Sequence, residues 1–181
     1  MADDTQKLDI LRGDARLAAL LQQGALHGTA QIHDAGRPLA QLPYEHGALH
    51  GTVIVMHSNG RPAARMQYLA DKAHGPATFF APDGRVQRTA NYRDGLLHGE
   101  ARNFYADGSV AQVEQYRLGQ LHGVQQRFHP NGKVAAHSHY QDGVLAGETQ
   151  AFNPDGRPLD AANKPMSRLA WWWRQRNGEP V

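Results

Sequence analysis

The residues Gly95 to Leu118 read GLLHGEARNFYADGSVAQVEQYRL, and this stretch decides the fold. A strand-compatible run, 100–105, leads into Asp107-Gly108, and a second extended run, 110–116, leads out of it. Glycine adopts positive φ without a Cβ penalty and aspartate tolerates it better than most residues, so Asp-Gly between two such runs is typical of a β-hairpin. The stretch therefore predicts a hairpin with its tip at Gly108.

The same pattern recurs along the chain with a period of 24 residues. The turn glycines of the repeat are Gly36, Gly60, Gly84, Gly108, Gly132 and Gly156. Four residues before them stand Ile32, Met56, Phe80, Phe104, Phe128 and Phe152. Eight residues after the first five stand Tyr44, Tyr68, Tyr92, Tyr116 and Tyr140. A further glycine opens each hairpin, at Gly28, Gly51, Gly75, Gly99, Gly123 and Gly147. Self-similarity at this period indicates a repeat array.

Both ends of the chain look like degenerate copies of the repeat. We interpret residues 1–23 as a capping hairpin, although 8–21 could also be an amphipathic helix. Residues 24–159 form six full repeats, and residues 160–181 a linker and a tryptophan-rich cap. Aligned with the repeat, Trp171 to Arg176 becomes a closing strand that Asn177-Gly178 ends as a vestigial turn. Atypical ends are expected where a repeat array must protect its outermost units.

The predicted fold is an all-β, elongated and twisted antiparallel meander of stacked hairpins, forming one continuous domain. Because alternate residues of a strand point to opposite faces, counting from each turn glycine places the phenylalanines and tyrosines on one face. The other face then receives polar side chains, among them Arg127, His129, His137 and His139. A bulge in either strand would change this assignment.

Composition limits the classes of function. Lys and Arg number 19 against 17 Asp and Glu, a net charge of +2, so we expect no nucleic-acid partner. The chain lacks cysteine, which excludes disulfides and Cys-ligated metals. No apolar run approaches the roughly 18 residues that span a membrane, and we expect no membrane contact. The start of the chain does not look like a signal peptide, although a mature chain with an added Met would look the same.

The repeat pattern resembles a known family. The sequence x-Gly-x-x-His-Gly, an aromatic residue, Asn/Asp-Gly-Arg/Lys and a later Tyr is similar to the variant MORN repeat of bacterial proteins often labelled as antitoxins. The match covers Gly24 to Gly156, with Asp71 and Ala146 as departures. The chain also resembles immunity proteins that neutralise phospholipase effectors of bacterial type VI secretion. The resemblance implies the hairpin sheet described above and a role in binding a toxin.

The histidines are the main candidates for chemistry. Five of them (His27, His50, His74, His98 and His122) occupy one repeat column and are interpreted as structural, closing the turns between hairpins. His137 and His139 lie two apart on a strand, and His129 lies on its partner strand. A metal site needs three or four converging ligands, and no acidic one is evident. We therefore expect no metal, no cofactor and no catalytic residues.

Residues that break the repeat are the best candidates for partner binding. Trp171, Trp172 and Trp173 are the most conspicuous, and on a strand Trp172 would face away from the other two. They could cap the last hairpin or anchor a partner, since Trp and Arg dominate interface hot spots. The predicted partner-binding residues are Trp171, Trp172, Trp173, Arg127, His129, His137 and His139.

The leading hypothesis is a non-enzymatic immunity or antitoxin protein that blocks a bacterial effector by steric occlusion. The resemblance suggests a type VI phospholipase as one candidate effector. Its partner would be a cognate toxin encoded nearby, and its location the periplasm, with the cytoplasm as the alternative. A second hypothesis is a scaffolding array that tethers a protein or membrane partner. The third and weakest is a metal enzyme that uses His129, His137 and His139. The sequence leaves the oligomeric state open, although open sheet edges would permit self-association.

Overall fold

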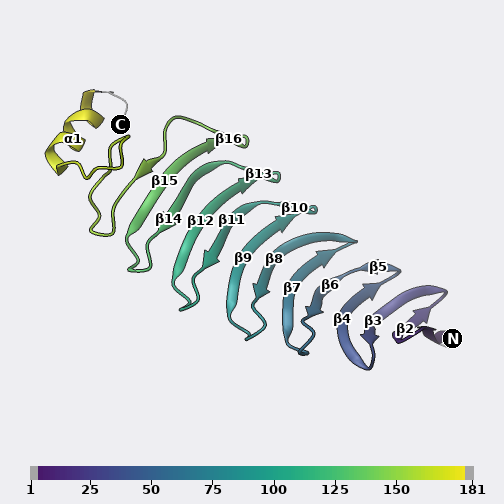
Figure 1. Ribbon diagram of the computed structural model, residues 1–181. Helices are drawn as coiled ribbons and strands as arrows, with labels where there is room; N and C mark the ends of the chain where they lie inside the picture. Colours follow the sequence, from purple (N-terminus) through teal and green to yellow (C-terminus); the bar gives the residue numbers. More distant parts are fainter. Residues whose placement is uncertain (1–3, 178–181) are drawn as a thin grey trace. The chain divides into compact units, whose positions relative to one another are not determined.

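The computed structural model describes residues 4–177 and has an all-β fold, as predicted (Figure 1). Its strands pair in antiparallel fashion, and the chain divides into two compact units, described here separately. The first unit ends at Leu96 and contains β1 (Thr5–Arg12), β2 (Ala15–Gln22), β3 (Ala25–Asp34), β4 (Arg37–Glu45), β5 (Ala48–Leu49), β6 (Gly51–Met56), β7 (Pro62–Leu69), β8 (Lys72–Phe80) and β9 (Val86–Arg93). Strand β10 (Leu96–Leu97) lies at the boundary.

The second unit begins at Leu97 and continues the same pattern. Its elements are β11 (Gly99–Phe104), β12 (Val110–Arg117), β13 (Gln120–Leu121), β14 (Gly123–Phe128), β15 (Val134–Gln141), β16 (Val144–Leu145), β17 (Gln150–Ala151) and the helix α1 (Arg168–Asn177). Within each unit, successive strands lie side by side in chain order, so each unit is a meander of hairpins (Figure 1).

The N-terminal segment is a hairpin, and the alternative helix over 8–21 is wrong. Strands β1 and β2 pair along their full length, from Thr5 opposite Gln22 to Arg12 opposite Ala15. Gly13, with φ at 61°, and Asp14 form the two-residue turn between them. Glycine at the first position of such a turn removes the Cβ penalty that other residues would pay there.

The hairpin tips fall at the six predicted turn glycines, all of which have positive φ. At Gly108 the glycine N–H donates to the Tyr105 carbonyl at 3.0 Å, and the Tyr105 N–H donates to the Ser109 carbonyl at 2.8 Å. Asp107 Oδ1 accepts hydrogen bonds from the Ser109 hydroxyl (2.6 Å) and the Ser109 N–H (2.9 Å). The bonds from Ser109 lower the pKa of the Asp107 carboxyl, since they stabilise its charged form.

The predicted division into an aromatic and a polar face is wrong, because the hairpins with tips at Gly36, Gly60, Gly84, Gly108 and Gly132 each contain a register shift, a β-bulge. In the hairpin of β14 and β15, the register shifts between Arg127 and Phe128, so Phe128 pairs with Val134 while Arg127 pairs with Ala136. The bulge reverses the faces along the second strand. Consequently His137 and His139 share the face of Phe128, and Tyr140 lies on the opposite face, with Arg127.

The tyrosine and opening-glycine columns form cross-strand pairs. Gly99 lies opposite Tyr116, Gly123 opposite Tyr140, and the earlier hairpins repeat the arrangement. Further along the same face lie small, deeply buried residues such as Ala77, Ala90 and Ala101, which are only 1–2% exposed. The small glycine and alanine residues on this face therefore leave room for the larger tyrosine rings to pack across neighbouring strands.

The closing strand predicted over Trp171 to Arg176 is wrong, because these residues belong to α1. Ser167 precedes the helix, and its hydroxyl accepts a hydrogen bond from the Ala170 N–H at 3.1 Å, as an N-cap residue does. The following residues, RLAWWWRQRN, contain no glycine, proline or β-branched residue to oppose a helix. The linker before it forms no strand, as expected, and carries one isolated bridge between Leu159 and Pro165. Gly178, half of the proposed vestigial turn, lies outside the described residues.

Candidate binding surface

Side-chain hydrogen bonds form a ladder between several successive hairpin tips, from the tip at Gly60 to that at Gly84, from Gly108 to Gly132 and from Gly132 to Gly156. Three residues before the turn glycine, His57 Nε2 lies 2.9 Å from the Phe80 carbonyl oxygen. The Tyr105 hydroxyl donates to the Phe128 carbonyl at 2.6 Å, and His129 Nε2 lies 2.9 Å from the Phe152 carbonyl oxygen. His129 therefore has a structural role in its repeat, the same role that His57 and Tyr105 have in their repeats.

Residues at the turns themselves extend this ladder. Asn59 and Asn131 donate side-chain hydrogen bonds to the carbonyls of Pro82 and Pro154 in the following turns, at 2.6 and 2.8 Å. Two of the basic residues that follow turn glycines do the same: Arg61 donates to the Asp83 carbonyl and Lys133 to the Asp155 carbonyl. These basic residues thus link neighbouring hairpins.

We expect His129→Ala to lower the free energy of unfolding by about 1 kcal/mol, the usual net value of one hydrogen bond. The Phe152 carbonyl would lose its imidazole partner in the partly buried ladder. Denaturant unfolding followed by circular dichroism measures the effect. His139→Ala is the matched control, because His139 is exposed and should change stability by less than about 0.5 kcal/mol. Equal stability of the two variants would contradict the role given to His129.

Three of the five histidines that precede the opening glycines lie beside acidic residues. His50 Nδ1 is 3.5 Å from Glu45, His74 Nδ1 is 3.7 Å from Asp94, and His122 Nδ1 is 3.3 Å from Asp142. Glu45 lies at the turn before the hairpin that His50 precedes. Asp94 and Asp142 lie at the turns after the hairpins that His74 and His122 precede. These contacts agree with the predicted structural role for His50, His74 and His122. At His27 and His98, by contrast, Nδ1 is buried and has no hydrogen-bond partner among the described residues.

The predicted partner-binding residues do not gather at one place. Arg127 is exposed on the face of Ala136, while His139 is exposed on the opposite face, and His129 is engaged by the Phe152 carbonyl. His137 and Trp171 both pack against the Phe152 ring. The Phe152 ring centroid is 5.4 Å from that of His137 and 6.2 Å from that of Trp171.

Helix α1 covers the last hairpin with Trp171 and exposes its other tryptophans. Trp171 packs edge-on against Phe152, and its indole N–H donates to Gln150 Oε1 at 3.4 Å. Trp172 and Trp173 are 54% and 55% exposed, and the Arg176 guanidinium lies 5.2 Å from the centre of the Trp172 ring. Trp171 thus caps the last hairpin, one of the two roles considered for the tryptophans. Trp172 and Trp173 are exposed and are accessible to a partner, the other role considered.

An apolar groove of about 510 Å³ lies between α1 and the last hairpin. Its lining residues come from the last turn and from one side of α1, and they are Phe152, Gly156, Pro158, Leu169, Trp171 and Trp172. Pro158 and Leu169 could not be recognised from the repeat pattern, because the groove forms only when residues 168–177 fold as a helix. Ser167 as an N-cap signal could have indicated that helix.

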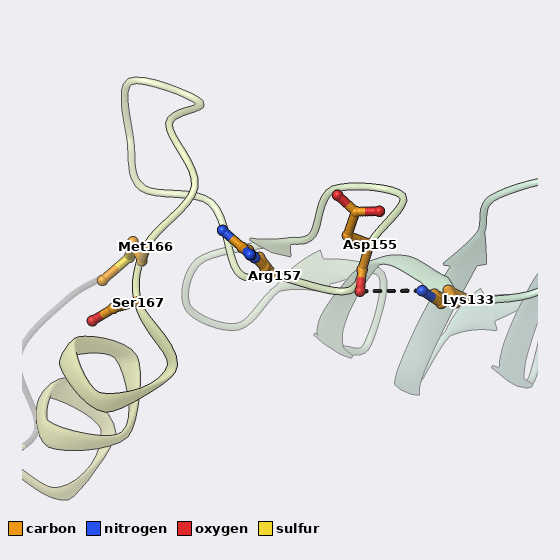
Figure 2. Close-up of a pocket in the computed structure, with 5 residues that line it drawn as sticks. All are labelled: Lys133, Asp155, Arg157, Met166 and Ser167. Atoms are coloured by element: carbon orange, nitrogen blue, oxygen red, sulfur yellow. Dashed lines mark hydrogen bonds between the residues drawn. The ribbon is translucent and has the colours of Figure 1, made fainter.

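A second, polar hollow of about 570 Å³ lies on the same turn (Figure 2). Lys133 reaches it from the preceding turn, Asp155 and Arg157 from the last turn, and Met166 and Ser167 from the segment that leads into α1. Gly156 and Pro158 line the apolar groove while Asp155 and Arg157 line this one, so the two hollows flank one stretch of chain. Apolar and basic surface therefore adjoin each other here.

Within residues 4–177, no group of three or more His, Asp or Glu side chains is arranged to hold a metal ion. The described part of the chain also contains no helix that is both long and apolar enough to cross a membrane.

The chain contains repeats of a known kind. Residues 97–117 and 121–142 match the family model described as the MORN repeat variant. No curated protein matches the chain significantly.

Several solved structures are similar in part. TarM has 15% identity over 60% of this chain and 19% of its own, with a TM-score of 0.36. A mutant TarM of S. aureus, in complex with fondaparinux, alpha-GlcNAc-glycerol and UDP, has 14% identity over 64% of this chain and 21% of its own (TM-score 0.38). Accessory secretory protein 1, 2 and 3 of Streptococcus pneumoniae has 15% identity over 86% of this chain and 20% of its own (TM-score 0.19). The chain spans about a fifth of the length of these proteins.

Proposed function

We propose that this repeat protein is a non-enzymatic immunity or antitoxin protein that binds a bacterial effector toxin and blocks it by steric occlusion. The observation that carries the proposal is the apolar groove beside α1, with Trp172 more than half exposed at its margin. A large aromatic side chain at the edge of a groove, next to arginine, is the composition typical of interface hot spots. The resemblance to immunity proteins for phospholipase effectors supplies the class of partner.

The surroundings of the groove indicate the chemistry of the partner. Lys133 and Arg157 line the adjoining hollow with Asp155 as its acidic member, and Arg176 lies against Trp172. An effector surface that offers an apolar side chain flanked by carboxylates would complement this arrangement. The groove would hold the apolar group, and the basic residues would set its orientation.

Occlusion requires a larger contact than the groove alone. A standard protein interface buries roughly 1,600 Å² in total, and the hairpin faces of the second unit would supply the remainder. Arg127 and His139 lie on opposite faces of that unit, so they report on which face joins the groove in the interface. For an effector that acts on envelope lipids, the place of action would be the periplasm.

The proposal is tested with Trp172→Ala and isothermal titration calorimetry against the toxin encoded beside this protein's gene. We expect at least a roughly 30-fold loss of affinity, equivalent to about 2 kcal/mol, which is typical of a hot-spot tryptophan. Val144→Ala is the matched control, because Val144 is an exposed apolar residue outside the groove and should leave affinity unchanged. Co-expression with the toxin should show the same order of protection in cells.

Arg127→Ala and His139→Ala then identify the participating face, since only one of them should weaken binding. Unchanged affinity of Trp172→Ala, in a protein that remains folded by circular dichroism, would place the interface elsewhere. Failure of the wild-type protein to bind or protect against the neighbouring toxin would overturn the proposed function itself.

A further inference from the structure

Strand β1 is an open edge of the first unit. It pairs with β2 on one side, and among residues 4–177 no pairing register is formed on its other side. The Gln23 N–H donates to the Asp4 carbonyl at 3.3 Å, and Asp4 lies opposite Gln23 in the hairpin register. Because hydrogen-bonded pairs alternate along an antiparallel ladder, even-numbered residues direct their backbone groups towards β2. Thr5, Lys7, Asp9 and Leu11 therefore direct theirs outward.

The last strand of the second unit is protected, in contrast to β1. Strand β17 has two residues, and the chain beyond it carries Pro154, Pro158 and Pro165, which cannot donate backbone hydrogen bonds. Helix α1 packs on this hairpin through Trp171. Short strands, prolines and a covering helix are the usual means of blocking a sheet edge. Strand β1 has eight residues, contains no proline and has no such cover.

We propose that two copies of this chain associate through antiparallel pairing of their β1 strands, with Lys7 of each copy opposite the partner's Asp9. Such a contact is isologous, so it joins two copies and closes.

Backbone geometry and charge together select this register. Only outward-directed residues can form hydrogen-bonded pairs across the new contact, so odd-numbered residues must lie opposite odd-numbered residues. Placing Lys7 opposite the partner's Lys7, or Asp9 opposite the partner's Asp9, would oppose like charges, which destabilises a pair of strands. The intermediate register pairs Lys7 with the partner's Asp9. This pair occurs twice, once on each side of the two-fold axis.

The side chains of β1 support the same register. Leu8 then meets the partner's Leu8 at a non-hydrogen-bonded position, where cross-strand side chains are closest. Ile10 and Leu11, which are 50% and 71% exposed in the single chain, would lie opposite Gln6 and Thr5 of the partner and lose part of that exposure. Arg16 Nη2 holds Asp9 Oδ2 at 2.7 Å from the β2 side and lowers the pKa of Asp9, so the carboxylate is ionised at neutral pH.

The test measures the mass of the full chain by sedimentation equilibrium as a function of concentration. A single chain has a mass of 19.9 kDa, and the wild type should reach twice that value. Lys7→Asp and Asp9→Lys each place like charges opposite each other at two symmetric positions, and each should weaken association by roughly tenfold or more. An equimolar mixture of the two variants should associate like the wild type, because every facing pair is then again of opposite charge.

The double variant Lys7→Asp with Asp9→Lys should also associate like the wild type. Asp34→Lys and Lys72→Asp carry the same charge changes at exposed positions away from β1, and they should not weaken association. Circular dichroism verifies that all variants are folded. A wild type that remains a single chain at all concentrations overturns the proposal. So does association that is unaffected in both single variants, or a mixture that fails to recover it.

Discussion

Replacing Gly123 with valine is expected to lower the free energy of unfolding by roughly 2–3 kcal/mol, the cost of forcing an L-residue into a strained backbone conformation. Gly123 has φ at 102°, which β-branched side chains avoid. An added Cβ would lie 3.5 Å from Gln115 Cβ, an ordinary contact, so the expected cost comes from the backbone and not from a clash. The new side chain would also occupy space opposite Tyr140.

Urea unfolding measures this prediction, with Gln126→Val as the control. Gln126 lies three residues further along β14 in regular strand geometry, where valine is well tolerated, so the control should change stability by less than about 0.5 kcal/mol. If the two valine variants were equally stable, positive φ at the opening glycine would not explain why glycine recurs in that column.

Phe152→Ala is expected to lower the free energy of unfolding by about 2–3 kcal/mol and to release α1 from the last hairpin. The value lies below the 3–5 kcal/mol typical of a fully buried phenylalanine, because Phe152 is only half-buried. Its ring is the contact between His137 and Trp171, so its loss removes the main apolar attachment of the helix. The groove beside α1 would lose one of its walls.

The three tryptophans of the chain are consecutive in α1, so tryptophan emission reports on the helix alone. Phe152→Ala should shift this emission to longer wavelength under native conditions. Phe104→Ala is the matched control, because Phe104 occupies the same repeat column two hairpins earlier, in β11. It should lower stability and leave native emission unchanged. An unshifted spectrum in Phe152→Ala would show that α1 is held by other contacts.

Periodicity made the architecture predictable. Columns such as the turn glycines and the tyrosines, kept in one register at 24-residue spacing, indicated antiparallel hairpins and located their tips. The pairing of tyrosine with glycine was not evident, because a bulge adds one residue to the second strand of each hairpin. Nothing in a single repeat distinguishes a regular hairpin from a bulged one, so the faces of His137 and Tyr140 were assigned incorrectly.

The candidate surface was predictable only in part. Deviation from the repeat pointed to the tryptophans, and the structure places Trp171 and Trp172 in the lining of the apolar groove. The same reasoning selected His129, as a member of a predicted polar cluster with His137 and His139. The ladder shows that His57, Tyr105 and His129 are alternative residues for one task, since imidazole and phenol can both reach the next carbonyl. Alignment to the repeat also led to the wrong prediction of a strand at Trp171 to Arg176, where α1 lies. A periodic pattern does not itself indicate where the repeats end.

The ladder of hydrogen bonds has a consequence for how the chain folds and how it can change in length. Each of its bonds joins residues 22 or 23 positions apart, so within each unit the ladder links a hairpin tip only to the next tip along the chain. Stability in such an array is approximately a sum of nearest-neighbour terms, and folding can nucleate at any adjacent pair of hairpins and propagate from there. Insertion or deletion of a whole 24-residue module would leave each remaining donor facing an equivalent carbonyl. This backbone should therefore tolerate duplication of a whole 24-residue repeat.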